Sequence, residues 1–311
     1  MVKIKVFLLG VGSWGRTLAG LLREKGHEVI LGARDFEEKE FLALSGIAST
    51  FERADCLDCS LMVMAVPSQF LRGAARSVAP FLGEVPVICG TKGLELGSHK
   101  RMSQVLSEEL PGRRILALSG PNLAPEIERG LPASTVIAGE GAEIGQEAFN
   151  SDRFRVYTND DLVGVELGGA LKNVIALAAG ALDGLGLGDN AKAALMTRGL
   201  AEISRLGTAM GANPATFAGL AGLGDLVATC SSPLSRNHRV GKLLAEGKPW
   251  EEIEQTGITA EGVPTAREAV ELARLHSVEM PIAEQVCRIL AGGSVEQAVE
   301  GLMIRRPKKE D

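Results

Sequence analysis

The sequence is poor in aromatic residues and carries no extended basic segment. Phe, Trp and Tyr together make up 4% of its 311 residues, so a core has to be built from Ala, Val, Leu and Ile. Lys and Arg number 33 against 39 Asp and Glu, a formal net charge of −6. A nucleic-acid-binding protein would show a basic stripe, whereas the dense charged run here, residues 305–311, is terminal and mixed in sign. We interpret that run as a solvated tail and expect no nucleic-acid partner.

Cysteine is also scarce. The chain has five cysteines, an odd number, and four of them lie in or beside apolar segments. This usage argues against a disulfide framework and favours a reducing compartment, so we predict a cytoplasmic protein. Cys56 and Cys59 have the spacing of a redox or zinc pair, but neither a second such pair nor a nearby pair of histidines accompanies them. We interpret the spacing as chance and expect no metal site.

The sequence offers no convincing membrane segment. Near the N-terminus, Lys3 and Lys5 precede the apolar residues 6–9 as in a signal peptide, but glycines interrupt the run from Gly10 onwards. The longest uncharged stretch near the middle of the chain, residues 206–224, contains five glycines and an Asn-Pro pair. A membrane helix needs about 20 predominantly apolar residues, so we expect no membrane insertion.

Glycine, in contrast, is abundant, with 38 residues in turns and within apolar stretches. The length predicts two domains at about 150 residues each. Residues 1–160 alternate short apolar runs with helical patterns, which is typical of strands buried on both faces of a parallel sheet. The predicted strands are residues 4–9, 27–31, 61–66, 85–89 and 115–118, and the first predicted helix is residues 17–25.

The pattern changes near Asn159–Asp161, and no convincing alternating strand follows. The helices predicted after this point are residues 162–182, 190–210, 215–223, 261–275 and 282–290. We therefore predict an α/β protein in which a Rossmann-type doubly wound sheet, residues 1–160, precedes an all-helical domain, residues 161–311.

A glycine-rich loop follows the first predicted strand. Gly10, Gly12 and Gly15, with Ser13 and Trp14 between the last two, form a G-x-G-x-x-G motif that opens the first helix. The first glycine permits a tight turn, the second lets the backbone approach a pyrophosphate, and the third lets strand and helix pack. Glycine-rich turns are common, but between a strand and a helix this motif indicates a dinucleotide whose phosphates meet the helix N-terminus.

The residues that end the second predicted strand bear on which dinucleotide is bound. A carboxylate about 20 residues after the loop would bond the ribose 2′-hydroxyl of NAD, whereas an arginine can take the 2′-phosphate of NADP. Arg34 and Asp35 both lie at this separation, and each is alternatively an ordinary exposed loop charge. A shift of one residue would exchange their roles. We favour Arg34 at the adenosine end, and therefore NADP.

Two lysines and one aspartate are candidates for chemistry. Lys172 lies in a predicted helix that is apolar on most sides, where it either extends to solvent or sits in a site as a desolvated acid or base. Lys92 follows the predicted strand 85–89, at the sheet edge where ligands bind in open α/β folds, or else it is a surface lysine. Asp225 follows a glycine-rich turn, either as a functional carboxylate or as a helix cap.

Two further segments offer polar groups. Ser235, Arg236 and Asn237 present a hydroxyl, a guanidinium and an amide in succession, a set that suits a phosphate unless it is simply a polar loop. Residues 120–126 follow the predicted strand 115–118 and have the turn and cap chemistry of a strand-to-helix junction. None of these short segments decides the function alone.

Taken together, the segments of this chain resemble the bacterial-type NAD(P)-dependent glycerol-3-phosphate dehydrogenases, in family order and from end to end. The matching segments are G-V-G-S-W-G (10–15), A-V-P-S-Q (65–69), T-K-G-L-E (91–95), S-G-P-N-L-A (119–124), E-L-G-G-A-L-K-N (166–173), G-D-N-A-K-A-A-L-M-T-R-G-L-A-E (188–202), F-A-G-L-A-G-L-G-D-L (217–226), S-R-N (235–237) and A-E-G-V-P-T (260–265). The sequence departs from the family at Gly32 and Leu123, where aromatic residues are common, and in residues 36–60, which are shorter than usual and match poorly. These departures bear on the adenine pocket and the cofactor preference more than on the reaction.

The resemblance implies a homodimer that reversibly reduces dihydroxyacetone phosphate to sn-glycerol 3-phosphate, the backbone unit of phospholipids. It makes Lys172 the proton donor and acceptor, with Lys92 and Asp225 as the other catalytic residues. Two lysines near the carbonyl oxygen would stabilise the charge that grows there. The resemblance assigns the phosphorylated triose to Lys92, Gly120, Asn122, Lys172, Asn173, Asp225, Ser235, Arg236 and Asn237. It assigns the cofactor, NADP or NAD with NADPH favoured, to Gly10, Gly12, Ser13, Trp14, Gly15, Arg34, Lys92, Ala124, Arg236 and Glu261.

Two other functions remain open. A β-hydroxyacid or ketopantoate-type reductase would also combine a Rossmann domain with a helical domain, but residues 235–237 argue against it. Activity on a non-phosphorylated ketoacid would support that function. A nucleotide-binding sensor without catalysis belongs to a different class, and the presence of both Lys92 and Lys172 argues against it. Cofactor binding without turnover would support the sensor.

Overall fold

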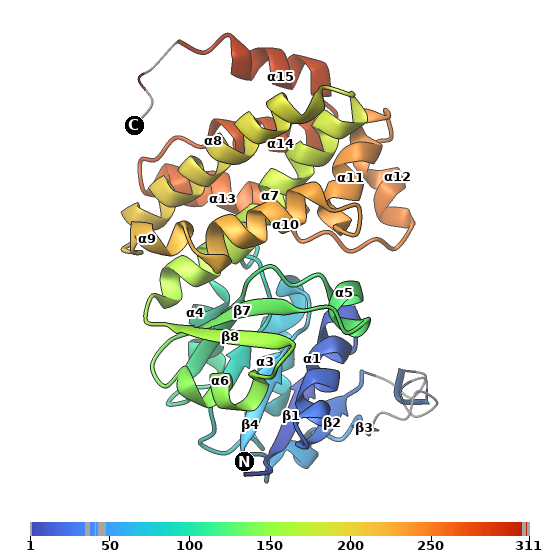
Figure 1. The fold of residues 1–311 in the computed structure, drawn as a ribbon, viewed down its shortest axis with the longest axis vertical. Helices are drawn as coiled ribbons and strands as arrows, with labels where there is room; N and C mark the ends of the chain where they lie inside the picture. The colour runs from blue at the N-terminus through green and yellow to red at the C-terminus, as the bar shows by residue number, and fades with distance from the viewer. Residues whose placement is uncertain (1, 35–37, 41, 43–47, 307–308, 310–311) are drawn as a thin grey trace.

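In a computed structural model the chain has two halves, a sheet with flanking helices and a helical half stacked on one edge of it (Figure 1). The structure describes residues 2–34, 38–40, 42, 48–306 and 309. The strands are β1 (Lys5–Leu9), β2 (Glu28–Gly32), β3 (Ser49–Thr50), β4 (Leu61–Met64), β5 (Val87–Cys89), β6 (Ile115–Ser119), β7 (Ala133–Ala138) and β8 (Phe154–Asn159). They form one eight-stranded sheet in the order β3-β2-β1-β4-β5-β6-β7-β8.

The doubly wound sheet predicted from the sequence is confirmed. The five predicted strands correspond to β1, β2, β4, β5 and β6, and the predicted helix 17–25 lies within α1 apart from its last residue. The helices and helical turns of this half are α1 (Ser13–Glu24), η1 (Arg53–Cys56), η2 (Ser68–Phe70), α3 (Leu71–Val78), α4 (Met102–Glu109), α5 (Ala124–Glu128) and α6 (Glu143–Phe149). The segment 36–60, singled out as poorly matched, lies partly outside the described residues.

One strand pair departs from the predicted parallel sheet. β6 and β7 run antiparallel, with Leu118 opposite Ile137, whereas the other pairs are parallel. A parallel crossover usually contains a full helix that spans the face of the sheet, but the connection between these strands, residues 120–132, contains only the five-residue α5. The chain therefore turns back along β6, and β8 then pairs with β7 at the sheet edge.

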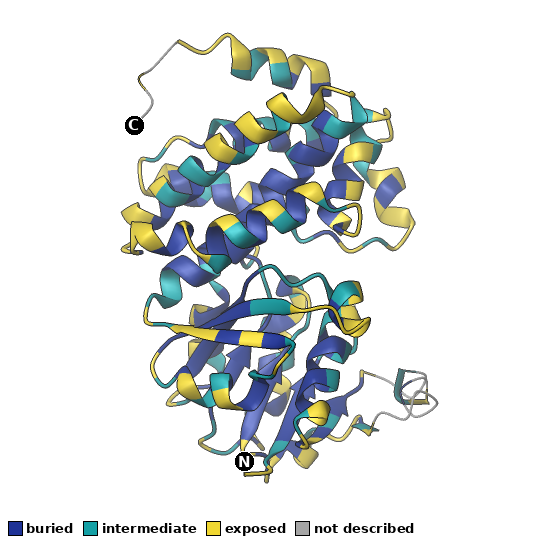
Figure 2. Cartoon of the chain, viewed as in Figure 1, coloured by how far each residue is buried: buried dark blue, intermediate teal, exposed yellow. Residues whose placement is uncertain are grey.

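Both faces of the inner strands of the sheet are buried, whereas the edge strand β8 is buried on one face only (Figure 2). Val6 and Leu8 of β1 pack on the face covered by α1 and α6, whereas Phe7 and Leu9 pack on the face covered by α3 and α4. None of the four is more than 3% exposed. Burial of each such side chain stabilises the fold by roughly 2 kcal/mol, which explains why these strands are continuous apolar runs and could be predicted.

The second half is helical throughout its described residues, also as predicted. Its elements are α7 (Leu162–Gly184), α8 (Gly188–Ala209), α9 (Pro214–Phe217), the π-helical turn η3 (Leu220–Gly224), α10 (Asp225–Ser231), α11 (Arg236–Ala245), α12 (Trp250–Gln255), α13 (Gly262–Leu275), α14 (Pro281–Leu290) and α15 (Val295–Met303). The continuous helix predicted for residues 215–223 is wrong. α9 ends at Phe217, Gly219 is extended, and η3 then leads into α10.

α7 is the central helix of this half (Figure 1). It begins after Asp161, whose carboxylate accepts a hydrogen bond from the backbone of Gly164 at 2.9 Å and caps the helix. Within the described residues, α7 is the one helix long and apolar enough to cross a membrane, whereas the sequence analysis had considered residues 206–224. The surrounding helices bury 78% of its most apolar window, which is typical of a core helix.

Candidate active site

Two lysines meet on one carboxylate where the two halves of the molecule face each other. Lys92 follows β5 in the sheet half, Lys172 lies within α7, and Asp225 is the first residue of α10. Lys92 Nζ lies 2.7 Å from one carboxylate oxygen of Asp225, and Lys172 Nζ lies 2.9 Å from the other. Lys172 and Asp225 are buried, and the Lys92 side chain is 16% exposed. The structure thus brings together the three residues that the sequence nominated for chemistry.

The charges of this cluster depend on each other. Burial raises the pKa of Asp225, but the attraction of Lys172 and Lys92 outweighs it, so this pKa lies below its ordinary value. The carboxylate is therefore ionised at neutral pH. Burial lowers the pKa of Lys92 to about 8, because the charge of Asp225 only partly offsets the desolvation. Lys92 is therefore mostly charged at neutral pH and loses its positive charge as the pH rises through about 8.

Thr229 also belongs to this cluster, although the sequence did not indicate it as a site residue. Its hydroxyl accepts a hydrogen bond from Lys172 Nζ at 2.6 Å and donates one to Asp225 at 3.2 Å. Thr229 lies four residues after Asp225 on α10, so both side chains lie on one face of the helix. The four-residue spacing between Asp225 and Thr229 is visible in the sequence. It places the two side chains on one helix face only if Asp225 lies within the helix, and the sequence left open that Asp225 caps it.

A second hydrogen-bonded chain fixes the helices around the cluster. The Asn237 amide nitrogen donates to Asn173 at 2.9 Å, and the Asn237 oxygen accepts from the backbone of Gly262 at 2.9 Å. The Asn173 amide nitrogen lies 3.5 Å from the carbonyl oxygen of Lys92. Both asparagines are buried. They therefore tie α7, α11 and the start of α13 to the loop that carries Lys92.

The phosphate candidates lie at the N-terminus of α11. Ser235 caps this helix, because its hydroxyl accepts from the backbone of His238 at 3.2 Å. Arg236 is the first residue of the helix and is exposed. Its guanidinium makes no hydrogen bond or ion pair within the described part of the chain. An unpaired guanidinium beside a helix N-terminus is well suited to an anion.

The residues that follow β6 contribute backbone rather than free side chains. The carbonyl oxygen of Gly120 accepts from Lys92 Nζ at 3.0 Å. Asn122 donates to the carbonyl oxygen of Ser134 at 3.1 Å and accepts from the hydroxyl of Thr135 at 2.9 Å. Its amide is thus engaged with β7, whereas the resemblance placed it at the substrate.

The glycine loop has the shape that a dinucleotide needs. A Cβ on Gly10 would lie 2.4 Å from the carbonyl oxygen of Ala65, and a Cβ on Gly15 would lie 1.8 Å from that of Gly10. A Cβ on Gly12 would meet nothing within 4 Å, so the backbone there is open to a ligand. The first turn of α1 has neither a side-chain cap nor an acidic residue. Its free N–H groups and positive dipole therefore fit a pyrophosphate.

Other cofactor candidates line the same end of the sheet. Trp14 Nε1 donates to the carbonyl oxygen of Gly90 at 3.1 Å, and Ala124 begins α5. Glu261 reaches from the start of α13 to Ser68, whose hydroxyl and backbone N–H donate to its carboxylate at 2.5 and 3.1 Å. Burial raises the pKa of Glu261. This pair joins the helical half to the loop after β4, and Ser68, although it lies in the matching segment 65–69, had no predicted role.

Arg34 is 79% exposed and forms an ion pair with Glu38 at 3.2 Å. Asp35, the alternative at this position, lies outside the described residues. Cys56 and Cys59 are buried free thiols. Across residues 2–34, 38–40, 42, 48–306 and 309, no group of three or more His, Cys, Asp or Glu side chains could hold a metal ion.

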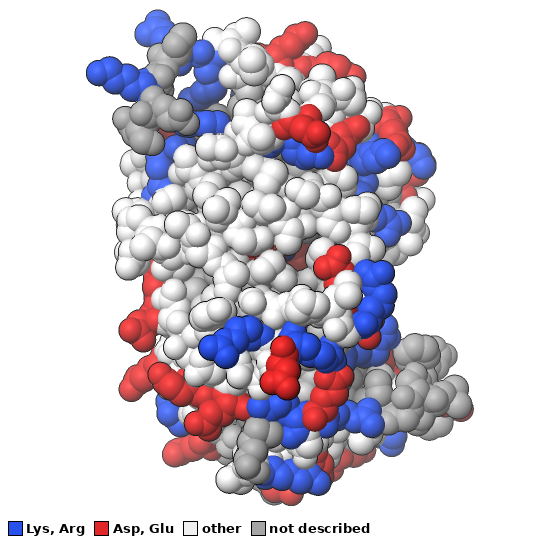
Figure 3. Space-filling model, in the orientation of Figure 1, with Lys and Arg blue, Asp and Glu red and all other residues white. Residues whose placement is uncertain are grey.

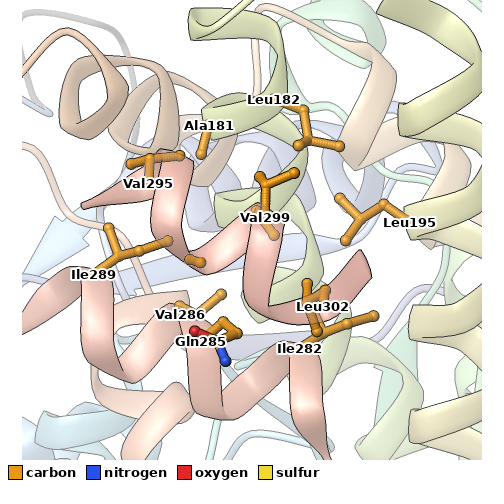
Figure 4. Close-up of a pocket in the computed structure, with 12 residues that line it drawn as sticks. Ala181, Leu182, Leu195, Ile282, Gln285, Val286, Ile289, Val295, Val299 and Leu302 are labelled. Carbon is orange, nitrogen blue, oxygen red and sulfur yellow. The ribbon is translucent and has the colours of Figure 1, made fainter. Parts of the chain in front are cut away.

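A small apolar pocket of about 30 Å³ lies away from these groups, between α7, α8, α14 and α15 (Figure 4). Leu182, Leu195, Val286 and Val299 line it, and Gln285 is the one polar residue in its lining. It contains no residue of the lysine cluster. We therefore assign it to helix packing and place the candidate site at the cluster.

The comparisons with known proteins agree with this geometry. Residues 39–144 match the family model for the N-terminus of NAD-dependent glycerol-3-phosphate dehydrogenase, and residues 161–300 match the model for its C-terminus. A protein of Desulfitobacterium hafniense called glycerol-3-phosphate dehydrogenase [NAD(P)+] is 47% identical over 100% of this chain and 93% of its own length. This chain belongs to the NAD-dependent glycerol-3-phosphate dehydrogenase family.

Solved structures of glycerol-3-phosphate dehydrogenases share the fold over nearly the whole chain. The enzyme of Coxiella burnetii is 35% identical with a TM-score of 0.93, over 97% of this chain and 99% of its own. The enzyme of Saccharomyces cerevisiae is 28% identical with a TM-score of 0.81, over 98% and 100%. A ketopantoate reductase of Ralstonia eutropha has a TM-score of 0.62 at 16% identity, over 96% and 100%, which shows a shared fold alone. The comparisons therefore favour the glycerol-3-phosphate dehydrogenase family over the ketopantoate-type alternative.

Proposed function

We propose that this chain catalyses the reversible, NAD(P)H-dependent reduction of dihydroxyacetone phosphate to sn-glycerol 3-phosphate. The observation that carries the proposal is the pair of lysine ammonium groups held on the buried carboxylate of Asp225. The glycine loop would hold a reduced NAD(P)H at the carboxyl edge of the sheet, and its nicotinamide would supply the hydride. Negative charge then grows on the substrate oxygen, and groups already positioned there stabilise it most effectively.

We assign distinct roles to the members of the cluster. Lys172 donates the proton to the developing alkoxide and removes it in the reverse reaction. Lys92 lies beside Gly120 and adds a second positive charge at the same oxygen. Asp225 and Thr229 orient Lys172, because both bond its Nζ. Residues 1–160 thus bind the dinucleotide and contribute Lys92, whereas residues 161–311 supply the other groups and bind the substrate.

The substrate phosphate is assigned to Arg236, with Ser235 and Asn237 beside it. In Arg236→Ala we expect the KM for dihydroxyacetone phosphate to rise about 10- to 100-fold, the usual range for loss of a charged hydrogen bond. The kcat should change much less, because the phosphate does not change charge in the reaction. Steady-state kinetics with dihydroxyacetone phosphate and with dihydroxyacetone, which lacks the phosphate, measure this effect. An unchanged KM, or an equal loss with both substrates, would remove Arg236 from the phosphate site.

The cofactor is NADP or NAD, and we propose that NADPH is preferred. Support comes from the end of β2, where Arg34 follows Ala33 and its backbone N–H donates to the Glu38 carboxylate at 2.6 Å. A cationic group at this position suits a 2′-phosphate more than a 2′-hydroxyl. The name of the Desulfitobacterium hafniense relative covers both nucleotides, so the preference is a property to be measured for this chain.

We also propose that the enzyme is a homodimer that uses the face formed by η3 and α10. Figure 3 shows a broad area without charged side chains across the middle of this face. Leu223, Val227 and Leu234 are each 41–43% exposed there. Exposed apolar patches of this kind mark protein interfaces, and homodimers are the commonest assemblies.

Light scattering after gel filtration tests the dimer. We expect the wild-type enzyme at twice the chain mass of 32.7 kDa, and Val227→Asp at the single mass. Leu275→Asp is the control, since Leu275 is 63% exposed at the end of α13. A single-chain mass for the wild type, or a dimer that survives Val227→Asp, would contradict the proposed interface.

The same proposal makes this a cytoplasmic enzyme without a nucleic-acid partner or membrane insertion, whose product enters phospholipid synthesis. Its five cysteines are free thiols, as a reducing compartment allows. Its apolar helix α7 is buried in the core. Its net charge of −6 is unfavourable for binding nucleic acid in general.

A further inference from the structure

Arg53 lies at the end of β2 although it is far from that strand in sequence. The backbone N–H of Ala33 donates to Thr50 of β3 at 2.7 Å, and the chain then enters η1, whose first residue is Arg53. Arg53 Nη2 reaches back and donates to the carbonyl oxygen of Ala33 at 2.9 Å. The last residue of η1, Cys56, is fully buried in the sheet core. The core thus anchors the turn that holds this guanidinium against the end of β2.

The Arg53 guanidinium has no carboxylate partner within the described part of the chain. Its Nη1 is buried and makes no hydrogen bond there. The neighbouring acids Glu52 and Asp55 are exposed and form no ion pair with it. A buried donor without an acceptor is costly, and of the five N–H groups of a guanidinium only those on Nη2 find an acceptor among the described residues, the carbonyl oxygen of Ala33. A guanidinium in this state is ready to accept an anion.

Gly32 allows the guanidinium to lie where it does. A Cβ at this position would lie 3.0 Å from Arg53 Nη1 and 2.3 Å from a methyl group of Leu9. A larger side chain would therefore collide with the sheet core and press on the guanidinium. Gly32, Ala33 and Arg53 together form a positively charged corner at the carboxyl end of β2.

Arg34, the arginine expected from the sequence to bind the 2′-phosphate, is in a different state. Its side chain is 79% exposed and already paired with Glu38. The same carboxylate also accepts from the backbone N–H of Arg34 at 2.6 Å. A phosphate on Arg34 would have to compete with this carboxylate, whereas Arg53 forms no ion pair with any acid in residues 2–34, 38–40, 42, 48–306 and 309.

We propose that Arg53 is the main residue by which this enzyme selects the 2′-phosphate of NADPH, with Arg34 in a secondary role. This inference rests on the proposed function, because it requires that the sheet bind NAD(P). In a Rossmann fold the residues just after β2 meet the ribose 2′ position, and Arg53 is bonded to that segment. Arginine can hold phosphate through two parallel hydrogen bonds. Arg53 therefore adds affinity for NADPH and none for NADH.

Nucleotide binding to the full-length protein without substrate tests this assignment. Isothermal titration calorimetry would compare NADPH with NADH, and 2′,5′-ADP with 5′-AMP, for the wild type, Arg53→Gln and Arg34→Gln. In Arg53→Gln we expect the Kd for NADPH and for 2′,5′-ADP to rise about 10- to 100-fold, as for loss of charged hydrogen bonds. The Kd for NADH should change less than about twofold. Arg113→Gln is a matched control, since Arg113 also donates to carbonyl oxygens, those of Leu82, Gly83 and Pro111.

Several outcomes would overturn the assignment. Equal weakening of NADPH and NADH in Arg53→Gln would make Arg53 a structural residue. The assignment would be refuted if Arg53→Gln kept the preference for NADPH over NADH, or if only Arg34→Gln lost that preference. A wild type that prefers NADH would also refute it. Failure of the proposed function looks different, because the wild type would then bind neither nucleotide or would bind them without reducing dihydroxyacetone phosphate. Circular dichroism of Arg53→Gln shows whether the variant keeps its fold. Arg53→Lys is a second variant, which retains the positive charge and so separates loss of the fold from loss of selectivity.

Discussion

Replacement of Lys172 by methionine lowers kcat for reduction of dihydroxyacetone phosphate by about 10²- to 10⁴-fold, the range that general acid–base catalysis supplies. Methionine retains most of the buried side-chain volume but has no proton to donate. It also leaves the Asp225 carboxylate one of its two ammonium partners, Lys92 at 2.7 Å. Affinity for NADPH should be nearly unchanged, because Lys172 lies in α7 and not in the glycine loop.

Rapid-mixing kinetics and NADPH titration on the same preparation separate these two effects. Lys192→Met is the matched control, because Lys192 also pairs with an aspartate, Asp183, at 2.8 Å. Asp183 lies eleven residues beyond Lys172 on α7, about 16 Å along the helix axis. If Lys172→Met kept most of its kcat, or lost NADPH binding or its fold, Lys172 would not be the proton donor.

Replacement of Asp225 by asparagine has the second large effect, and it acts on both stability and rate. Two ammonium groups would remain together in a buried site without a countercharge. Removal of one partner from a buried ion pair typically costs about 3 kcal/mol or more in the free energy of unfolding. We also expect kcat/KM to fall about 10²- to 10³-fold, because Lys172 loses the group that orients it.

The pH dependence of the rate in Asp225→Asn should change in a defined direction. The negative charge of Asp225 raises the pKa of Lys92 and so opposes the lowering by burial. Without that charge the pKa of Lys92 falls below about 8, and the ammonium form is lost at lower pH. The alkaline limb of the pH–rate profile for reduction should therefore move to lower pH.

Urea denaturation and a pH–rate profile measure the two effects on Asp225→Asn. Asp183→Asn is the control, since it removes a lysine-paired carboxylate outside the cluster. A profile that kept its alkaline limb in Asp225→Asn, with stability unchanged, would mean that Asp225 does not hold the two lysines in solution.

The elements of the fold that could be predicted from the sequence are those with unambiguous burial. β1, β2, β4, β5 and β6 lie inside the sheet and appear as apolar runs between glycines or prolines. β8 is the edge strand, and its burial alternates between Phe154, Val156 and the exposed Arg155 and Tyr157. That alternation is brief and polar, so the strand was not predicted. The antiparallel pairing of β7 goes with a connection whose helix, α5, has only five residues, and composition does not indicate it.

The candidate site was also predictable only in part. Lys92, Lys172 and Asp225 could be nominated from their local sequence, as a lysine after a strand, a lysine within an apolar helix and a carboxylate after a glycine-rich turn. Their meeting depends on η3, a π-helical turn that brings Asp225 to the start of α10. No role could be predicted for Thr229 or Ser68, because each forms its hydrogen bond with a residue far away in the sequence. No local sequence pattern around Arg53 indicates that its guanidinium donates to the carbonyl oxygen of Ala33.

The most direct test of the account is the loss of absorbance at 340 nm with dihydroxyacetone phosphate, run in parallel with NADPH and NADH on the wild-type enzyme. We predict turnover, with sn-glycerol 3-phosphate formed in amounts equal to the nucleotide oxidised and a higher rate with NADPH. A protein that bound NADPH but oxidised neither nucleotide with this substrate would contradict the account, and it would point to another reductase substrate or to a sensor.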